Sequence, residues 1–238
     1  NNIGNIGSSL HIDQIGGINH FFNLGTGDAD IILETVTDAT VSGGGARHME
    51  IINSDGVSVS GGSGSVYADY YVEGTTNTTI HGGQLAGDNF DISGNHNNLT
   101  IYADWSGSSL QDHLYFRDFS GSAEVILNTG ERVDIGEFAG AGTITLKNLM
   151  SSTPKAILFT GGNSFEDYDI TVTDIDSDTE LDMVLSESGN SSHQIVLKSF
   201  FNAAARRNYE WEPSEHYLSF GLSVINSAFG ETRQLNDA

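Results

Sequence analysis

Short runs in which apolar and polar residues alternate follow one another along most of the chain, separated by clusters of Gly, Asn, Asp and Ser. Alternation with a period of two is typical of a β-strand that buries one face, and these small or polar residues favour turns. The pattern predicts strands over residues 31–36, 39–42, 48–51, 57–60, 66–72, 78–81, 89–93, 99–102, 114–117, 123–128, 132–135, 143–147, 156–160, 169–173, 181–185 and 194–199.

A pattern of residue types recurs at a constant interval of 21 residues over positions 46–108. Aliphatic residues share one position of the repeat, and residues that tolerate a left-handed backbone share another. The aliphatic column comprises Val59, Ile80 and Ile101, and the turn column comprises Gly56, Asn77 and Asn98. The interval changes later in the chain, which is what loop insertions at one corner produce while the strands stay in register. A repeat of this kind is typical of a stacked β-coil.

We therefore predict an all-β fold, a right-handed parallel β-helix (β-solenoid), over residues 31–199. In such a fold the strands of successive turns stack in parallel about 4.8 Å apart. An antiparallel β-sandwich is the alternative, because it also consists of short strands separated by frequent turns. A sandwich gives no reason, however, for equal residue types to recur at a fixed interval.

The two ends of the chain differ in composition from the middle. Residues 1–30 are rich in Gly, Asn and Ile and contain an apolar and aromatic cluster at 18–24, so we expect an N-terminal cap there. Residues 200–238 are expected to form a short C-terminal helical cap or appendage, because 200–210 has a helical composition that ends before Pro213. Caps protect the strand edges of a solenoid. Contact with a neighbouring domain or partner is the alternative role.

The chain carries a strong negative charge. It has 32 Asp and Glu against 9 Lys and Arg, which gives a net charge of −23 at pH 7. Nucleic acid is excluded as a partner because its phosphates would be repelled, and an acidic polysaccharide is disfavoured for the same reason. Since cations must screen the self-repulsion, we expect a secreted, extracellular protein in a medium rich in salt or calcium. No apolar run approaches the length of a membrane span.

Acidic residues alternate with other residues between positions 174 and 182. In an extended or looped backbone this alternation places the carboxylates on one side, a geometry that calcium accepts. The predicted metal ligands, with calcium as the expected ion, are Asp174, Asp176, Asp178 and Glu180. The loop is not an EF-hand, because Thr179 occupies the Gly position and Leu185 the position of the final Glu. A solvated loop without an ion is the alternative.

Residues 155–201 carry a resemblance to a known family. In Asp169–Phe201 an acidic loop is followed by two strands around the turn Gly189-Asn190 and by an aliphatic strand that ends in paired aromatics. This segment resembles the region that follows the glycine-rich calcium repeats in bacterial type I-secreted RTX proteins. The nonapeptide G-G-x-G-x-D-x-U-x of that family is not matched here, since Val66 stands at the Asp position after Gly61. We therefore expect aliphatic columns, and not interior calcium, to hold the stack.

An enzymatic alternative depends on a group of carboxylates between positions 69 and 112. A glycoside hydrolase needs two carboxylates at a defined separation. The candidates are Asp69, Asp88, Asp91, Asp104 and Asp112. Nearby aromatic residues that would bind a sugar are Tyr67, Tyr70, Tyr71, Tyr102 and Trp105. Packing in the core is the alternative role for these aromatic side chains.

The sequence favours a non-enzymatic module, a spacer or binding surface within a larger secreted bacterial toxin, adhesin or exoprotein. Its partners would be other domains of a longer chain, or a host or cell-surface protein or glycan. The alternative is a β-helix glycoside hydrolase or another polysaccharide-active enzyme that uses the Asp group. An ice- or surface-binding face would require aligned Thr residues, and the Thr pairs at 78–79, 143 and 145, and 171 and 173 predict no regular column.

Overall fold

The computed structural model describes residues 2–3, 9–13, 16, 20–23, 29–42, 46–60, 68–82, 87–103, 112–127, 132–149, 155–160, 167–201, 208–212, 217–221 and 232–233. Within these ranges the chain forms strands and turns and contains no α-helix. The described residues accordingly include no helix that is long and apolar enough to cross a membrane.

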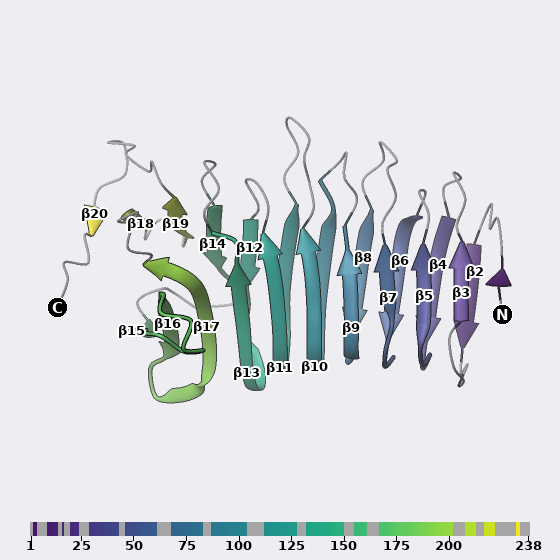
Figure 1. Ribbon diagram of the computed structural model, residues 1–238, viewed down its shortest axis with the longest axis horizontal. Coiled ribbons are helices and arrows are strands. Elements are labelled where there is room, and N and C mark those ends of the chain that lie inside the picture. Colours follow the sequence, from purple (N-terminus) through teal and green to yellow (C-terminus); the bar gives the residue numbers. More distant parts are fainter. Residues whose placement is uncertain are drawn as a thin grey trace.

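The strands follow one another along the longest axis of the molecule, with the two termini at opposite ends (Figure 1). Their bounds are β1 Asn2–Ile3, β2 Ser9–Asp13, β3 His20–Asn23, β4 Ala29–Glu34, β5 Ala39–Ser42, β6 Ala46–Ile52, β7 Ser58–Ser60, β8 Asp69–Glu73, β9 Thr76–His81, β10 Asn89–Ala103, β11 His113–Leu127, β12 Arg132–Ile135, β13 Phe138–Lys147, β14 Lys155–Phe159, β15 Tyr168–Thr173, β16 Leu181–Glu187, β17 Asn190–Phe201, β18 Asn208–Glu212, β19 Tyr217–Gly221 and β20 Thr232–Arg233.

Alternate strands build two parallel sheets. The first sheet contains β2, β4, β6, β8, the first halves of β10 and β11, β12 and β14. The second sheet contains β1, β3, β5, β7, β9, the second halves of β10 and β11, β13 and β17. Each turn of the chain thus adds one strand to each sheet. This arrangement confirms the predicted β-solenoid and excludes the antiparallel sandwich.

The repeat in the sequence corresponds to the register of the core. Val59 pairs with Ile80, and Ile80 pairs with Ile101. All three side chains are completely buried, and Val125 continues the column on the next strand. Burying a Val or Ile side chain stabilises a fold by about 1.5–3 kcal/mol. The aliphatic columns between the two sheets therefore hold the stack together, as the sequence predicted.

Residues with a left-handed backbone form the corner that leads from the first sheet to the second. Gly56, Asn77 and Asn98 have φ angles of 66°, 46° and 65°. Asn98 Nδ2 donates a hydrogen bond to Asn77 Oδ1 (3.2 Å), and Asn77 Nδ2 donates one to Asp55 Oδ1 (3.1 Å). The predicted turn column is confirmed, and the side chains of Asn77 and Asn98 connect neighbouring turns.

The connections that lead back from the second sheet to the first differ in length. They comprise residues 4–8, 24–28, 43–45, 61–68, 82–88, 104–112, 128–131 and 148–154. The register of the flanking strands continues across them, since His48 pairs with Asp69 and Asp69 pairs with Asn89. Changes in repeat interval therefore arise at this corner, as the loosened spacing predicted, and smaller changes occur between the two sheets, where register shifts interrupt the pairing of β10 with β11 and of β11 with β13.

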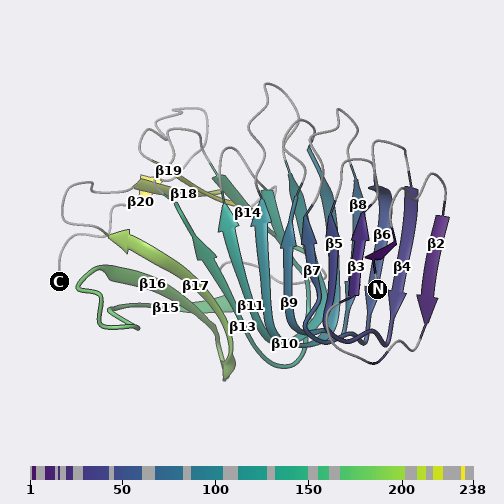
Figure 2. The ribbon, with the colours of Figure 1, turned by 45° about the vertical axis from the view of Figure 1, so that its right-hand side comes forward.

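The C-terminal end of the stack is antiparallel. In the second sheet, β16 and β15 add to β17 in antiparallel order, and in the first sheet β19, β18 and β20 follow β14 in the same way. Figure 2 shows these strands at the end of the stack opposite β2. The region 31–199, predicted as a parallel β-helix throughout, therefore includes two strands that do not follow the parallel stacking.

The helical segment predicted for residues 200–238 is not found where the structure describes this part of the chain. Residues 200–201 end β17, and 208–212, 217–221 and 232–233 are strands. The remaining residues of the segment lie outside the described ranges. Pairing of β19 with β14 satisfies backbone groups that a helix would pair internally, so tertiary contacts override local composition here.

Strand pairing does not change at residue 31, where we predicted the boundary of an N-terminal cap. β2 pairs in parallel with β4, and β3 pairs in parallel with β5. Ile12 and Phe22 point into the same core as the later aliphatic columns. The parallel stack therefore includes strands from within residues 1–30.

Candidate functional site

Two of the predicted catalytic carboxylates are buried at the corner where strands of the first sheet begin. Asp88 and Asp112 are 1% and 0% exposed. Asp88 Oδ1 accepts a hydrogen bond from the backbone N–H of Ala68 (2.8 Å), and Asp112 Oδ1 accepts one from the backbone N–H of Asp88 (2.8 Å). Each carboxylate thereby links its turn to the preceding one. Their described hydrogen bonds thus have a structural role in the stack.

Two other predicted catalytic carboxylates, Asp69 and Asp91, lie on the outer face of the neighbouring strands β8 and β10 and have different partners. Asp69 is exposed, and its Oδ1 accepts a hydrogen bond from Asn89 Nδ2 (2.8 Å). Asp91 forms an ion pair with Arg117, whose Nε lies 2.7 Å from Asp91 Oδ1. Asp104 lies outside the described residues.

Tyr70, predicted as a binding residue, belongs to the core. Its side chain is 2% exposed and stacks on Phe90, with ring centres 4.7 Å apart. Burial, together with the nearby charges of Asp88 and Asp112, raises the pKa of its hydroxyl above the ordinary value. The core role that we considered for the aromatic residues is therefore correct for Tyr70.

The remaining described aromatics do not form one platform. Tyr71 lies on the outer face of the first sheet, where its hydroxyl donates a hydrogen bond to Glu73 Oε2 (2.9 Å). Tyr102 belongs to the second sheet and stacks on His81, with ring centres 4.1 Å apart. Tyr67 and Trp105 lie outside the described residues.

A groove of about 410 Å³, which the sequence did not predict, lies on the outer face of the first sheet at β10, β11, β12 and β14. Its lining residues stand in register columns on adjacent strands. They include Asn89, His113 and Arg132 in one column and Asp91, Tyr115, Asp134 and Leu158 in the other. Asp134 lies between Tyr115 and Leu158 in the second column. A short side chain between two longer ones produces the depression.

Asp134 is the centre of a hydrogen-bond network in this groove. Arg132 donates from Nε to Asp134 Oδ1 (2.6 Å) and from a terminal nitrogen to Oδ2 (2.9 Å), and His113 Nε2 lies 2.8 Å from Oδ2. Burial of Asp134 opposes its ionisation, but hydrogen bonds and positive charge from His113 and Arg132 outweigh burial and lower the pKa of Asp134. The carboxylate therefore remains ionised and fixes both neighbours.

The acidic loop between β15 and β16 surrounds the ammonium group of Lys198. Lys198 Nζ lies 2.7 Å from Asp176 Oδ1, 2.9 Å from Asp182 Oδ2 and 3.9 Å from Asp178 Oδ2. Asp182 is completely buried, and its Oδ1 accepts a hydrogen bond from the backbone N–H of Ser199 (2.7 Å). Burial of Lys198 opposes its charge, but hydrogen bonds to Asp176 and Asp182 raise its pKa. Lys198 thus supplies positive charge inside the loop.

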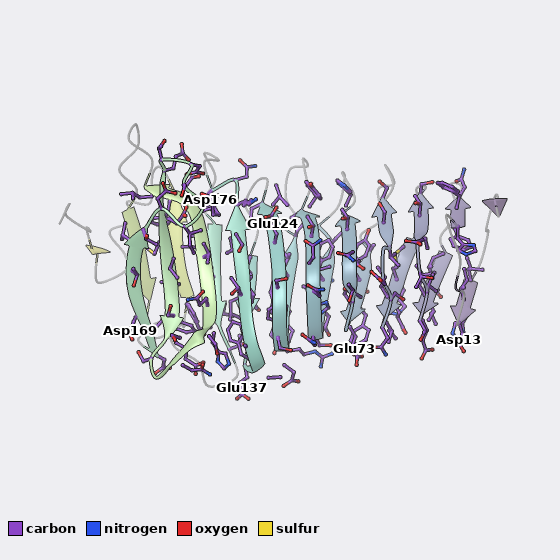
Figure 3. All side chains as sticks on the ribbon, turned by 60° about the horizontal axis from the view of Figure 1, so that its bottom comes forward. Asp13, Glu73, Glu124, Glu137, Asp169 and Asp176 are labelled. Atoms are coloured by element: carbon purple, nitrogen blue, oxygen red, sulfur yellow. The ribbon has the colours of Figure 1, made fainter. Side chains whose placement is uncertain are left out.

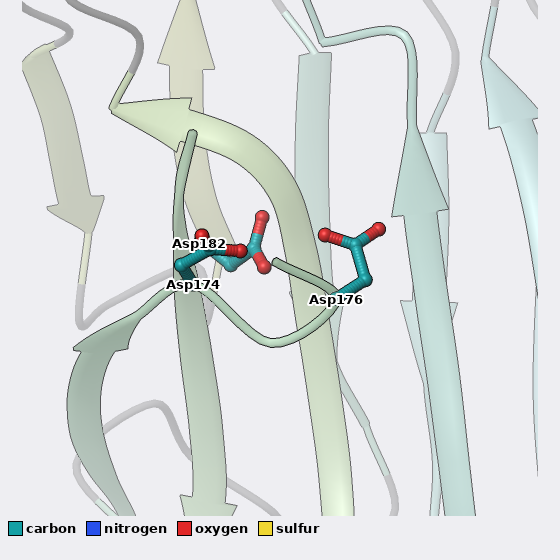
Figure 4. Close-up of side chains that lie close together, drawn as sticks. All are labelled: Asp174, Asp176 and Asp182. Atoms are coloured by element: carbon teal, nitrogen blue, oxygen red, sulfur yellow. The ribbon is translucent and has the colours of Figure 1, made fainter. Parts of the chain in front are cut away.

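Two carboxylates of this loop and one from the start of β16 have a geometry that could hold a metal ion. Asp174, Asp176 and Asp182 each offer an oxygen within 4.8 Å of the others, and Figure 4 shows them around the segment that leads into β16. Two of the predicted ligands are therefore brought together, with Asp182 as the third member. Asp178 and Glu180 are not members of this group, and Asp178 Oδ1 instead accepts a hydrogen bond from the Glu180 backbone N–H (2.9 Å).

Hydroxyl side chains form a row on the outer face of the second sheet. Thr40 pairs with Ser58, Ser58 with Thr79, and Thr79 with Thr100. Glu124 follows on the next strand and interrupts the row. The Thr pairs considered in the sequence predicted no regular column, and of their members only Thr79 belongs to this row.

The negative charge is distributed along the whole molecule. In Figure 3, Asp13, Glu73, Glu124, Glu137 and Asp169 extend from one end of the stack to the other. Mutual repulsion therefore acts along the full length of the solenoid.

No family model matches the chain, and searches of curated proteins and of solved structures found no protein with significant similarity.

Proposed function

We propose that this chain is a non-enzymatic β-solenoid module that acts as a spacer or binding surface within a larger secreted bacterial protein, such as a toxin, adhesin or exoprotein. The observation that carries the proposal is the structural use of Asp88 and Asp112, the buried carboxylates that link successive turns. A glycoside hydrolase needs two carboxylates that both reach the substrate.

The architecture supports a role in contact with other molecules. A solenoid offers long, regular faces over which extended contacts form. Among the described strands, β2 pairs only with β4, so one edge of the first sheet is available to a neighbouring domain or partner. Other domains of a longer chain, or a cell-surface protein or glycan, are therefore the proposed partners.

A secreted location is supported by the net charge of −23, since extracellular salt and calcium would screen the repulsion. The resemblance of residues 155–201 to exported RTX proteins supports the same location. Fractionation of a producing bacterium, followed by detection with an antibody to this chain, tests it. We expect the protein in the medium, and retention in the cytoplasm would contradict this part of the proposal.

Polysaccharide turnover separates a module from the alternative hydrolase. The protein is incubated with a panel of neutral and acidic polysaccharides, and the release of reducing ends is measured. We expect no release above background for the wild type. Release that disappears in Asp91→Asn or Asp104→Asn, with the fold intact by circular dichroism, would show that the hydrolase alternative is correct.

We also infer that calcium is the ion suited to the Asp174, Asp176 and Asp182 group, because these ligands are all carboxylate oxygens. Calcium must displace the Lys198 ammonium, which already contacts Asp176 and Asp182. We therefore expect weak binding by the wild type and tighter binding by Lys198→Met, measured by isothermal titration calorimetry. Melting temperatures that are equal with calcium and with chelator, in both proteins, would show that this inference is wrong.

A further inference from the structure

We propose that the groove on the outer face of the first sheet binds an uncharged oligosaccharide, with the ring of Tyr115 as the stacking platform. The groove lies across β10, β11, β12 and β14, and its volume of about 410 Å³ falls within the range of small-molecule sites. This proposal rests on the binding-surface role argued above and assigns a ligand class to it.

The shape of the groove follows from the strand register. Tyr115, Asp134 and Leu158 are direct neighbours on β11, β12 and β14. Asp134 is only 5% exposed, so it forms the floor, and the half-buried Tyr115 and Leu158 form the two walls. A sugar ring placed over Asp134 would lie against the face or edge of Tyr115. Aromatic rings provide large apolar contact area for such a ligand.

The polar groups of the groove offer both donors and acceptors. A sugar hydroxyl donates and accepts hydrogen bonds at once, so it is recognised best where both kinds of group lie together. Arg132 and His113 are donors whose side chains remain 46% and 39% exposed, and Asn89 and Asp91 add acceptor oxygens beside them. A row of alternating hydroxyls along a sugar chain would match this arrangement.

These groups are held in position by the protein itself. Asp134 fixes Arg132 by two hydrogen bonds and contacts His113. Asp91 is held by Arg117, whose guanidinium carbon lies 5.9 Å from the ring centre of Tyr71. Side chains fixed before binding lose little conformational entropy when the ligand arrives. Tyr71 thus lies beside the guanidinium that holds Asp91 at the edge of the site.

The charge of the groove selects an uncharged ligand. The positive charges of Arg132 and Arg117 are matched by the negative charges of Asp134 and Asp91, to which they are bonded, and His113 shares the Asp134 carboxylate with Arg132. An acidic sugar would have to compete with these carboxylates for cations that are already hydrogen-bonded, and the net charge of −23 would repel it. A cationic sugar would compete with the arginines for carboxylates that are already hydrogen-bonded. An uncharged oligosaccharide is neither repelled by the net charge nor in competition with the arginines.

Binding of defined oligosaccharides tests the proposal. Cellohexaose, xylohexaose, mannohexaose and chitohexaose serve as uncharged probes, with hexagalacturonate and chitosan hexamer as the acidic and cationic comparators. Affinities are measured by isothermal titration calorimetry and contacts by saturation-transfer NMR. We expect at least one uncharged probe to bind and Tyr115→Ala to weaken it about tenfold, the scale of one lost stacking contact. Tyr115→Phe, which keeps the ring, should retain the affinity.

A matched variant on the other sheet controls for general effects. Tyr102→Ala also removes a stacked surface aromatic, but from the second sheet, and should leave binding unchanged. The proposal is overturned if no uncharged probe binds, if a charged comparator binds more tightly, or if Tyr115→Ala and Tyr102→Ala behave alike. Cleavage of a bound probe, detected by mass spectrometry, would instead contradict the non-enzymatic role and leave the binding site in place. Absence of binding would leave the spacer role intact.

Discussion

Two regions of the molecule bury carboxylates, and the cost of burying the negative charge is offset by different partners in each. At the corner of the stack, Asp88 and Asp112 each accept a hydrogen bond from the backbone of the preceding turn. In the acidic loop, buried Asp182 contacts the ammonium of Lys198. The corner arrangement can be repeated on every turn because it uses backbone donors. Asp182 also accepts hydrogen bonds from the backbone N–H groups of Ile175 and Ser199, but its compensating positive charge comes from one side chain, so a single substitution should disrupt the arrangement.

The largest expected effect is the loss of Lys198. Lys198→Met leaves the completely buried Asp182 without its cation, and removing one partner of a buried ion pair costs about 3–5 kcal/mol. Urea unfolding followed by circular dichroism measures the loss. Lys147→Met is the matched control, because its pair with Glu124 is exposed and should contribute only about 0–1 kcal/mol. Equal losses of unfolding free energy in Lys198→Met and Lys147→Met would contradict the contrast between the buried and the exposed ion pair.

The next effect concerns acid stability and His96. His96 is buried at the tight corner between Thr75 Oγ1 (3.0 Å) and the Ser93 carbonyl (2.7 Å). Burial lowers its pKa to about 4, although the bond to Ser93 and the charge of Glu73 oppose this shift. The unfolded chain, with a His pKa near 6.5, therefore binds the proton first as the pH falls.

The stability that neutral His96 provides is full above pH 6.5 and is lost as the pH falls toward 4, with a total loss of about 3 kcal/mol. Unfolding by urea is measured across this range for the wild type and for His96→Gln. The variant lacks this titration, so the difference between the two proteins should shrink as the pH falls. If the difference in unfolding free energy between the wild type and His96→Gln stayed constant over this pH range, the pH dependence would not come from His96.

A smaller effect is expected at the corner carboxylates. Asp112→Ala leaves the backbone N–H of Asp88 without its acceptor, which costs about 1–3 kcal/mol for a buried donor. Asp112→Asn keeps an acceptor oxygen and should lose less. Differential scanning calorimetry measures both variants. If Asp112→Asn lost as much stability as Asp112→Ala, the charge of Asp112 would contribute more to stability than its hydrogen bond to the backbone.

The smallest effect is expected at the turn column. Asn77 has a φ of 46°, and a residue with an ordinary side chain in this conformation costs about 1–2 kcal/mol. Asn77→Ala should therefore be less stable than Asn77→Gly, because both variants lose the hydrogen bond to Asp55 but only Ala strains the backbone. A higher melting temperature for Asn77→Ala than for Asn77→Gly would show that the left-handed backbone does not determine the residue type here.

Much of the stack could be predicted from the sequence because its register is written as a repeat. Val59, Ile80 and Ile101 share a position in the sequence and a column in the core. The strands at 169–173 and 181–185 were also predicted, but their antiparallel direction was not, since alternation is the same in parallel and antiparallel sheets. The direction is set by pairing partners, which alternation does not specify.

The sites were less predictable because they depend on the face that each side chain occupies. Tyr70 and Tyr71 are neighbours, yet one is in the core and the other is outside. Alignment of Tyr70 with Met49, one interval earlier, was the available signal for burial. The groove was missed because His113 and Arg132 are 19 residues apart, so the interval of 21 does not align them.

Where the chain returns from the second sheet to the first, the described strands end and begin along one long edge of the stack. The number of residues between these strands varies while the strands keep their pairing. Peptides inserted there would be presented in a line, one per turn, spaced by the distance of about 4.8 Å between neighbouring strands. The solenoid is therefore a natural scaffold for displaying short sequences as an ordered array, without any change to its core.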